Sequence, residues 1–158
     1  MLKMWWVSFT FTSSNLTPQL MTAKNRIMAT LAGFVVYFML GFLLYGVLLM
    51  DFYSANAGTA TGVMRTDDDM QWWALIAGNV MMSYLLVYIF GTWANITTFG
   101  GGLKAGAIIG LIMSLGFSLN MYGTTNISNL TSSLVDSIVI TVMMGFTGGV
   151  IGWVLGRK

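Results

Sequence analysis

The stretch that decides the fold is GGLKAGAIIGLIMSLGFS, residues 101–118, in which small side chains recur at every fourth position of an apolar run. The recurring residues are Gly102, Gly106, Gly110, Ser114 and Ser118. Residues four apart form a nearly axial ridge on an α-helix, and a ridge of small side chains lets a second helix backbone come close. The stripe therefore predicts a helix that packs tightly against another helix.

A glycine-rich stretch can also cradle a phosphate, which is the alternative to helix contact. The P-loop requires GxxxxGK[ST] after a strand, and the dinucleotide fingerprint requires GxGxxG in a strand–turn–helix unit. Neither pattern is present, so we favour helix packing. The last apolar segment offers a matching surface in two glycine series with the same spacing: Gly145 with Gly149, and Gly148 with Gly152 and Gly156. Self-association of two chains through the same ridge stays open as an alternative.

The composition identifies lipid as the solvent of this chain. Of its 158 residues, 56% are hydrophobic and 8% are charged, and the mean hydropathy is +0.78. Soluble domains carry about 25% charged residues. Cysteine and histidine are both absent, which excludes disulfides, thiolate metal sites and the commonest general base.

Four apolar segments are each about the 20 residues that cross a hydrocarbon core of roughly 30 Å. We therefore predict an all-α integral membrane protein, a bundle of four transmembrane helices in one domain, residues 28–156, after a cytoplasmic or interfacial tail, residues 1–27. The predicted helices span residues 28–50, 72–93, 103–122 and 134–156.

The orientation follows from the lysine and arginine residues beside the membrane. With four crossings, one side collects six of the seven basic residues: Lys3, Lys24, Arg26, Lys104, Arg157 and Lys158. The other side receives Arg65. The sequence thus predicts that both termini are cytoplasmic and that the protein lies in the inner membrane.

Polar residues inside the apolar segments are candidates for function. Asp136 follows Ser133 at the predicted start of the last helix, where it would partner the helix dipole while Ser133 caps; alternatively it is a proton or cation site. Asn79 and Ser83 lie one turn apart. They are interhelical hydrogen-bonding groups or, with Asp136, the lining of a solute path to which Tyr37 and Tyr45 add hydroxyls.

The order of these features resembles the bacterial membrane proteins grouped as domain-of-unknown-function family 1761. The resemblance covers about residues 28–156 and is carried by GFLLYGVLLM at 41–50, GGGLKAGAIIGLIMSLGF at 100–117, LVDS at 134–137 and GGVIGWVLG at 148–156. It implies a small four-helix membrane protein and no assigned chemistry.

For function we predict a non-enzymatic membrane component that acts through helix–helix association or as a subunit of a complex; the alternative is an oligomeric permease for a small solute or ion. Its expected partners are the lipid bilayer and a second copy or another membrane protein. We expect no catalytic residues, metal or cofactor, since no nucleophile–base pair or ligand set is visible. The scattered basic residues give no nucleic-acid-binding patch.

Overall fold

Four long apolar helices dominate the computed structural model, which describes residues 22–157. Helix α1 (Ala23–Gly41) continues through the π-helical segment η1 (Phe42–Leu48), and α3 (Trp72–Tyr88) continues through the similar segment η3 (Ile89–Ala94). The last two helices are α4 (Phe99–Thr124) and α5 (Leu130–Leu155). Each is long and apolar enough to cross a membrane. The predicted all-α, four-helix fold class is confirmed, and this is a multi-pass membrane protein.

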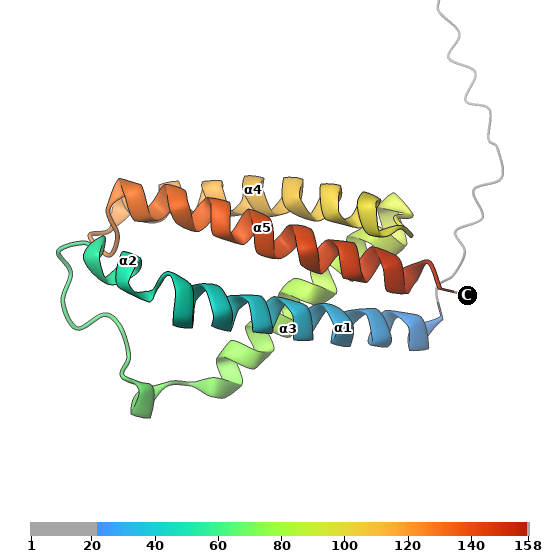
Figure 1. Cartoon of the computed structure of the whole chain (residues 1–158), viewed down its shortest axis with the longest axis horizontal. Helices are drawn as coiled ribbons and strands as arrows, with labels where there is room; N and C mark the ends of the chain where they lie inside the picture. The colour runs from blue at the N-terminus through green and yellow to red at the C-terminus, as the bar shows by residue number, and fades with distance from the viewer. Residues whose placement is uncertain (1–21, 158) are drawn as a thin grey trace, which may run out of the picture.

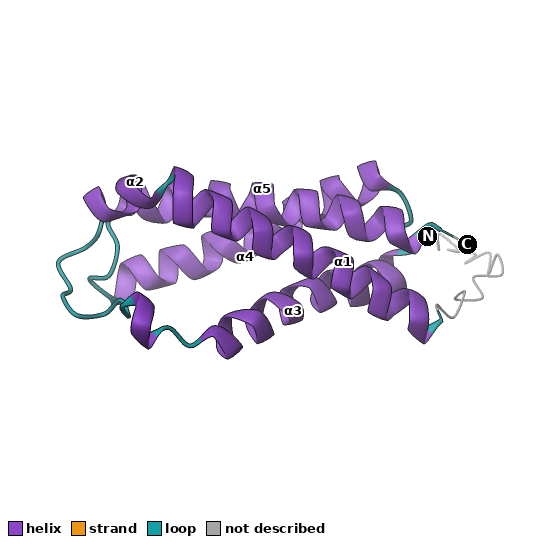
Figure 2. Ribbon diagram, turned by 60° about the horizontal axis from the view of Figure 1, so that its bottom comes forward, coloured by secondary structure: helices purple, strands orange, loops and turns teal. Residues whose placement is uncertain are grey.

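The helices do not form a closed ring: α1, α3 and α5 meet, and α4 packs on the outer side of α5. The most buried of them, α5, lies alongside α4 over much of its length and also packs against α1, which in turn contacts α3 (Figure 1). Helix α3 crosses the others at a marked angle, and its first half leaves the bundle in both views (Figure 2).

One end of the bundle gathers basic residues. The start of α1, the start of α4 and the end of α5 lie together there, and they carry Lys24, Arg26, Lys104 and Arg157 (Figure 2). The opposite end carries Arg65 and the short helix α2 (Met50–Ala55), together with the 3-10 turn η2 (Asp67–Asp69). This separation of charge matches the one used above to predict orientation.

The helix boundaries correct several predictions. Helix α4 begins at Phe99 rather than 103 because Thr98 Oγ1 accepts a hydrogen bond from the Gly101 amide at 3.1 Å. Helix α5 begins at Leu130 rather than 134 because Asn129 Oδ1 accepts from the Ser132 amide at 2.8 Å. The predicted Ser133 cap is therefore wrong, since the cap is Asn129.

The predicted tail also needs correction, because α1 already begins at Ala23 and includes residues 23–27. Residues 1–21 lie outside the described part of the chain. Between η3 and α4 the turn is only four residues long, 95–98, and begins at Asn95 in the left-handed conformation with φ 48°. Asparagine tolerates that conformation better than most residues, which explains why the helix ends there.

A bend after η1 places α2 over the start of α5. The π turn closes with a hydrogen bond from the Leu49 amide to the Leu44 carbonyl at 2.8 Å, and the chain then turns into α2. Beyond α2, the Gly58 amide donates to the Ile127 carbonyl at 2.9 Å, which ties this loop to the α4–α5 loop. Asn129 Nδ2 donates to Asn56 Oδ1 at 3.2 Å.

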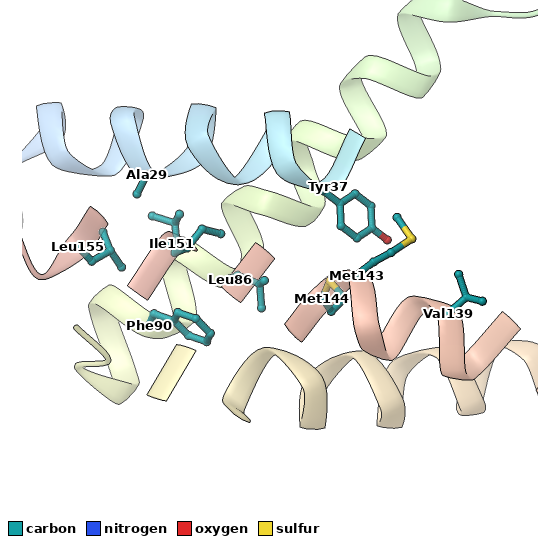
Figure 3. Close-up of a cluster of buried hydrophobic side chains, with 10 residues drawn as sticks. Ala29, Tyr37, Leu86, Phe90, Val139, Met143, Met144, Ile151 and Leu155 are labelled. Carbon is teal, nitrogen blue, oxygen red and sulfur yellow. The ribbon is translucent and has the colours of Figure 1, made fainter. Parts of the chain in front are cut away.

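The apolar core forms where α1, α3 and α5 meet (Figure 3). Phe90 of η3 and Met144 of α5 are completely buried, while the Tyr37 ring reaches from α1 toward Met143 (Figure 3). Because neighbouring lipid is as apolar as these side chains, close packing and polar contacts decide which helix faces meet. The faces that meet are those with small or polar side chains, described next.

Candidate functional site

The small-residue ridge of α4 lies against α5. Its five residues, Gly102, Gly106, Gly110, Ser114 and Ser118, are the buried residues of α4. A Cβ atom on Gly102 would overlap the Gly148 carbonyl oxygen, and one on Gly106 would overlap the Met144 carbonyl oxygen. These are backbone atoms and cannot swing aside, so glycine is required for this approach.

On α5, one of the two glycine series makes the closest contact. Gly148 and Gly152 face the α4 backbone: a Cβ on Gly152 would lie 2.5 Å from the Thr98 carbonyl oxygen and 3.3 Å from Gly102 Cα. Gly149 and Gly145 flank this line. A Cβ on Gly149 would lie 2.7 Å from the Phe99 ring, and one on Gly145 would make an ordinary 3.4 Å contact with Ala107.

Toward the α2 end, the ridge changes from backbone packing to hydrogen bonding. Ser114 Oγ donates to the Ser137 carbonyl oxygen at 3.2 Å, across the α4–α5 contact. One turn further, Ser118 Oγ donates to Asp136 Oδ2 at 3.4 Å. The stripe that began as a packing ridge therefore ends at the half-buried carboxylate of α5.

Two tyrosine hydroxyl groups, from η1 and α2, also converge on Asp136. Tyr45 of η1 donates to Oδ1 at 2.6 Å, and Tyr53 of α2 donates to the same oxygen at 3.4 Å. The two tyrosine rings lie 5.3 Å apart between centroids. Burial and the nearby Asp136 carboxylate raise the pKa of Tyr53 to about 12, so its phenol stays a donor at neutral pH.

A pocket of about 190 Å³ opens beside this carboxylate. Its lining combines the carboxylate, several hydroxyls and an apolar wall: Tyr53, Phe117, Ser118, Met121, Ile127, Ser128, Ser132, Ser133 and Asp136. The pocket lies between α2, α4 and the start of α5, at the end of the bundle away from Lys24 and Arg157. Such a lining suits a small molecule that has an apolar body and a polar or charged group.

The three residues of the predicted polar path, Asn79, Ser83 and Asp136, do not lie close to one another. Asn79 Nδ2 donates to the Leu75 carbonyl oxygen of its own helix at 2.6 Å. Ser83 is wholly buried beside Gly33, whose added Cβ would also touch Ile151 of α5. Ile151 lies about four helical turns, roughly 22 Å, beyond Asp136 on the same helix.

Two buried hydroxyls have no hydrogen-bond partner within residues 22–157: Ser83 of α3 and Thr147 of α5. Both side chains are fully buried. A buried hydroxyl without a partner costs about 1–3 kcal/mol. Position 83 requires a small side chain because it faces Gly33. A Cβ added to Gly33 would lie 3.3 Å from Ser83 Cβ.

Sequence reasoning missed Tyr53 and the pocket-lining serines Ser128 and Ser132. Tyr53 lies in the short helix α2, Ser128 in the α4–α5 loop and Ser132 in the first turn of α5. All three lie outside the predicted apolar segments, so no spacing within one predicted helix links them to Asp136. The capping residues Thr98 and Asn129 carried a signal, since Thr and Asn favour the position before a helix.

Comparison with protein families, curated proteins and solved structures gives no match for this chain.

Proposed function

We propose that this protein is a non-enzymatic component of the inner membrane that acts by helix–helix association, and that its first partner is a second copy of the chain. Four membrane-spanning helices support the membrane assignment. The basic end of the bundle supports a cytoplasmic location for the start of α1 and the end of α5. The resemblance to family 1761 stays a prediction and adds no chemistry.

The observation that carries the proposal is an uncovered surface on the first half of α3. We call it the α3 seam: Leu75, Gly78 and Asn79, whose spacing places them on one helix face. Leu75 and Gly78 are exposed, and a Cβ on Gly78 would meet nothing within 4 Å. Since α3 diverges from the bundle here, another helix can approach the seam closely (Figure 1).

Asn79 gives the seam its preference for a second copy. One N–H of its carboxamide bonds the Leu75 carbonyl, which leaves a second N–H and the amide oxygen for other partners. An amide is both donor and acceptor, so two copies related by a two-fold axis can exchange hydrogen bonds. Polar side chains between membrane helices contribute about 0.6 kcal/mol on average and up to about 1.7.

The experiment is native mass spectrometry of the protein after mild extraction from its membrane. We expect a species of twice the 17.3 kDa chain mass. Asn79→Leu should reduce the dimer fraction severalfold. Asn120→Leu is the matched control, because Asn120 is exposed on α4 and also donates to the carbonyl four residues earlier, that of Gly116 at 2.9 Å.

Two outcomes would contradict self-association. A monomer from wild-type protein under conditions that preserve known membrane dimers would refute it, as would equal dimer fractions for the Asn79 and Asn120 variants. A stoichiometric foreign subunit that Asn79→Leu displaces would instead assign the α3 seam to a heteromeric complex. The permease alternative lacks its expected support, since Asn79 and Ser83 do not share a path with Asp136 in the described residues.

A further inference from the structure

Within residues 22–157, the carboxylate of Asp136 is held by hydroxyls and not by a cation. Its hydrogen bonds come from Tyr45, Tyr53 and Ser118. The described basic residues of α1, α4 and the α5 end lie at the other end of the bundle, and Arg65 donates to the Asp69 carbonyl oxygen at 3.4 Å. A half-buried negative charge is costly without an opposite charge, so the pocket favours a cationic occupant.

The two oxygens of Asp136 differ in how much bonding capacity they retain. Oδ1 accepts from both tyrosines, including the short 2.6 Å bond from Tyr45. Among the described residues, Oδ2 accepts only the long bond from Ser118 at 3.4 Å. A carboxylate oxygen has room for about two hydrogen bonds. Oδ2 can therefore accept an N–H from a bound molecule.

The rest of the lining selects the kind of cation. Phe117, Met121 and Ile127 supply an apolar wall, and Ser128, Ser132 and Ser133 supply hydroxyls. A hard metal ion prefers six or more oxygen ligands and gains nothing from an apolar wall. The volume of about 190 Å³ exceeds the ~150 Å³ cavity that holds a benzene molecule. Both features fit a small organic molecule.

We propose that this pocket binds a small organic ammonium ion, a protonated primary amine with a short apolar body. The ammonium group donates to Asp136 Oδ2 and to serine hydroxyls, and the apolar body packs against Phe117 and Met121. Tyr45 and Tyr53 hold the carboxylate in place through Oδ1. This site is separate from the α3 seam, so the proposal does not depend on self-association.

The test uses the full chain in lipid nanodiscs and isothermal titration with benzylammonium chloride. Benzyl alcohol is the neutral probe of nearly the same size, and empty nanodiscs correct for partition into lipid. We expect benzylammonium to bind at least tenfold more tightly than benzyl alcohol. Asp136→Asn should weaken benzylammonium binding at least tenfold. Asp51→Asn, at an exposed carboxylate of α2 at the same end of the bundle, should leave it unchanged.

If Asp136→Asn does not fold, Phe117→Ala gives a second comparison with the wild type. Phe117 is 67% exposed, so Phe117→Ala should fold normally while it weakens benzylammonium binding severalfold through loss of the apolar wall. No binding by wild-type protein at millimolar benzylammonium would overturn the proposal, and so would equal affinity for the alcohol. Displacement of benzylammonium by sodium chloride at the same concentration would mean that the pocket prefers an inorganic cation. That result would also overturn the proposal.

Discussion

Replacement of Gly106 by alanine tests the α4–α5 contact at one of its closest backbone approaches. A Cβ at this position would overlap the Met144 carbonyl oxygen and lie 3.2 Å from Gly148 Cα. The obstacle is backbone on a neighbouring helix, so the two helices must separate to make room. Gly116→Ala is the matched control, because Gly116 lies in the same helix and its added Cβ would meet nothing within 4 Å.

The comparison isolates the cost of the clash. Both variants gain the same helix propensity, up to about 1 kcal/mol for glycine to alanine. Overpacking a well-packed interface costs about 1–3 kcal/mol. We expect Gly106→Ala to be less stable than Gly116→Ala by about 2–3 kcal/mol, in the upper part of that range because backbone atoms cannot rotate away.

The assay is reversible unfolding in mixed micelles of increasing denaturing-detergent content, followed by tryptophan fluorescence. The free energy of unfolding of the two variants is compared with that of the wild type. Gly106→Ala should unfold at lower detergent fraction, while Gly116→Ala should match or exceed the wild type. Equal stability of the two variants would refute the close backbone contact between α4 and α5.

Three further predictions follow from named contacts. Tyr45→Phe removes the 2.6 Å bond to Asp136 and should lower the free energy of unfolding by about 1–2 kcal/mol, while Tyr84→Phe, at an exposed tyrosine, should not; equal effects would deny the bond a stabilising role. Ser83→Ala removes a buried hydroxyl without a partner and should raise the free energy of unfolding by about 1 kcal/mol; a loss of stability in the same assay would reveal a hidden partner. Thr59→Cys should react with a membrane-impermeant thiol reagent from outside the cell and Thr97→Cys should not, since these exposed residues lie at opposite ends of the bundle; the reverse labelling would invert the orientation.

The fold could be predicted because lipid imposes strong rules on a chain. About 20 apolar residues are needed for each crossing, and the four segments met that requirement. The position of Gly102, Gly106 and Gly110 on one face indicated which side of the third spanning helix would lie against a neighbour. In the structure these glycines face the α5 backbone.

The helix ends and the pocket could not be read from the same patterns. Hydropathy places a boundary where polar residues begin, whereas a helix ends where its backbone groups find other partners. Thr98 and Asn129 supply those partners and extend two helices by four residues each relative to the prediction. The Asp136 pocket depends on the bend after η1, which brings Tyr53 back over α5. A bend of this kind has no periodic signature in the sequence.

The most direct test of the proposed function is disulfide cross-linking in native membranes, which is clean because the chain contains no cysteine. Leu75→Cys lies on the α3 seam, and Ala77→Cys lies about 160° around the same helix at a position that is also exposed. Mild oxidation should produce covalent dimers from Leu75→Cys and none from Ala77→Cys. Equal cross-linking at both positions, or dimers from Ala77→Cys alone, would contradict self-association through the α3 seam.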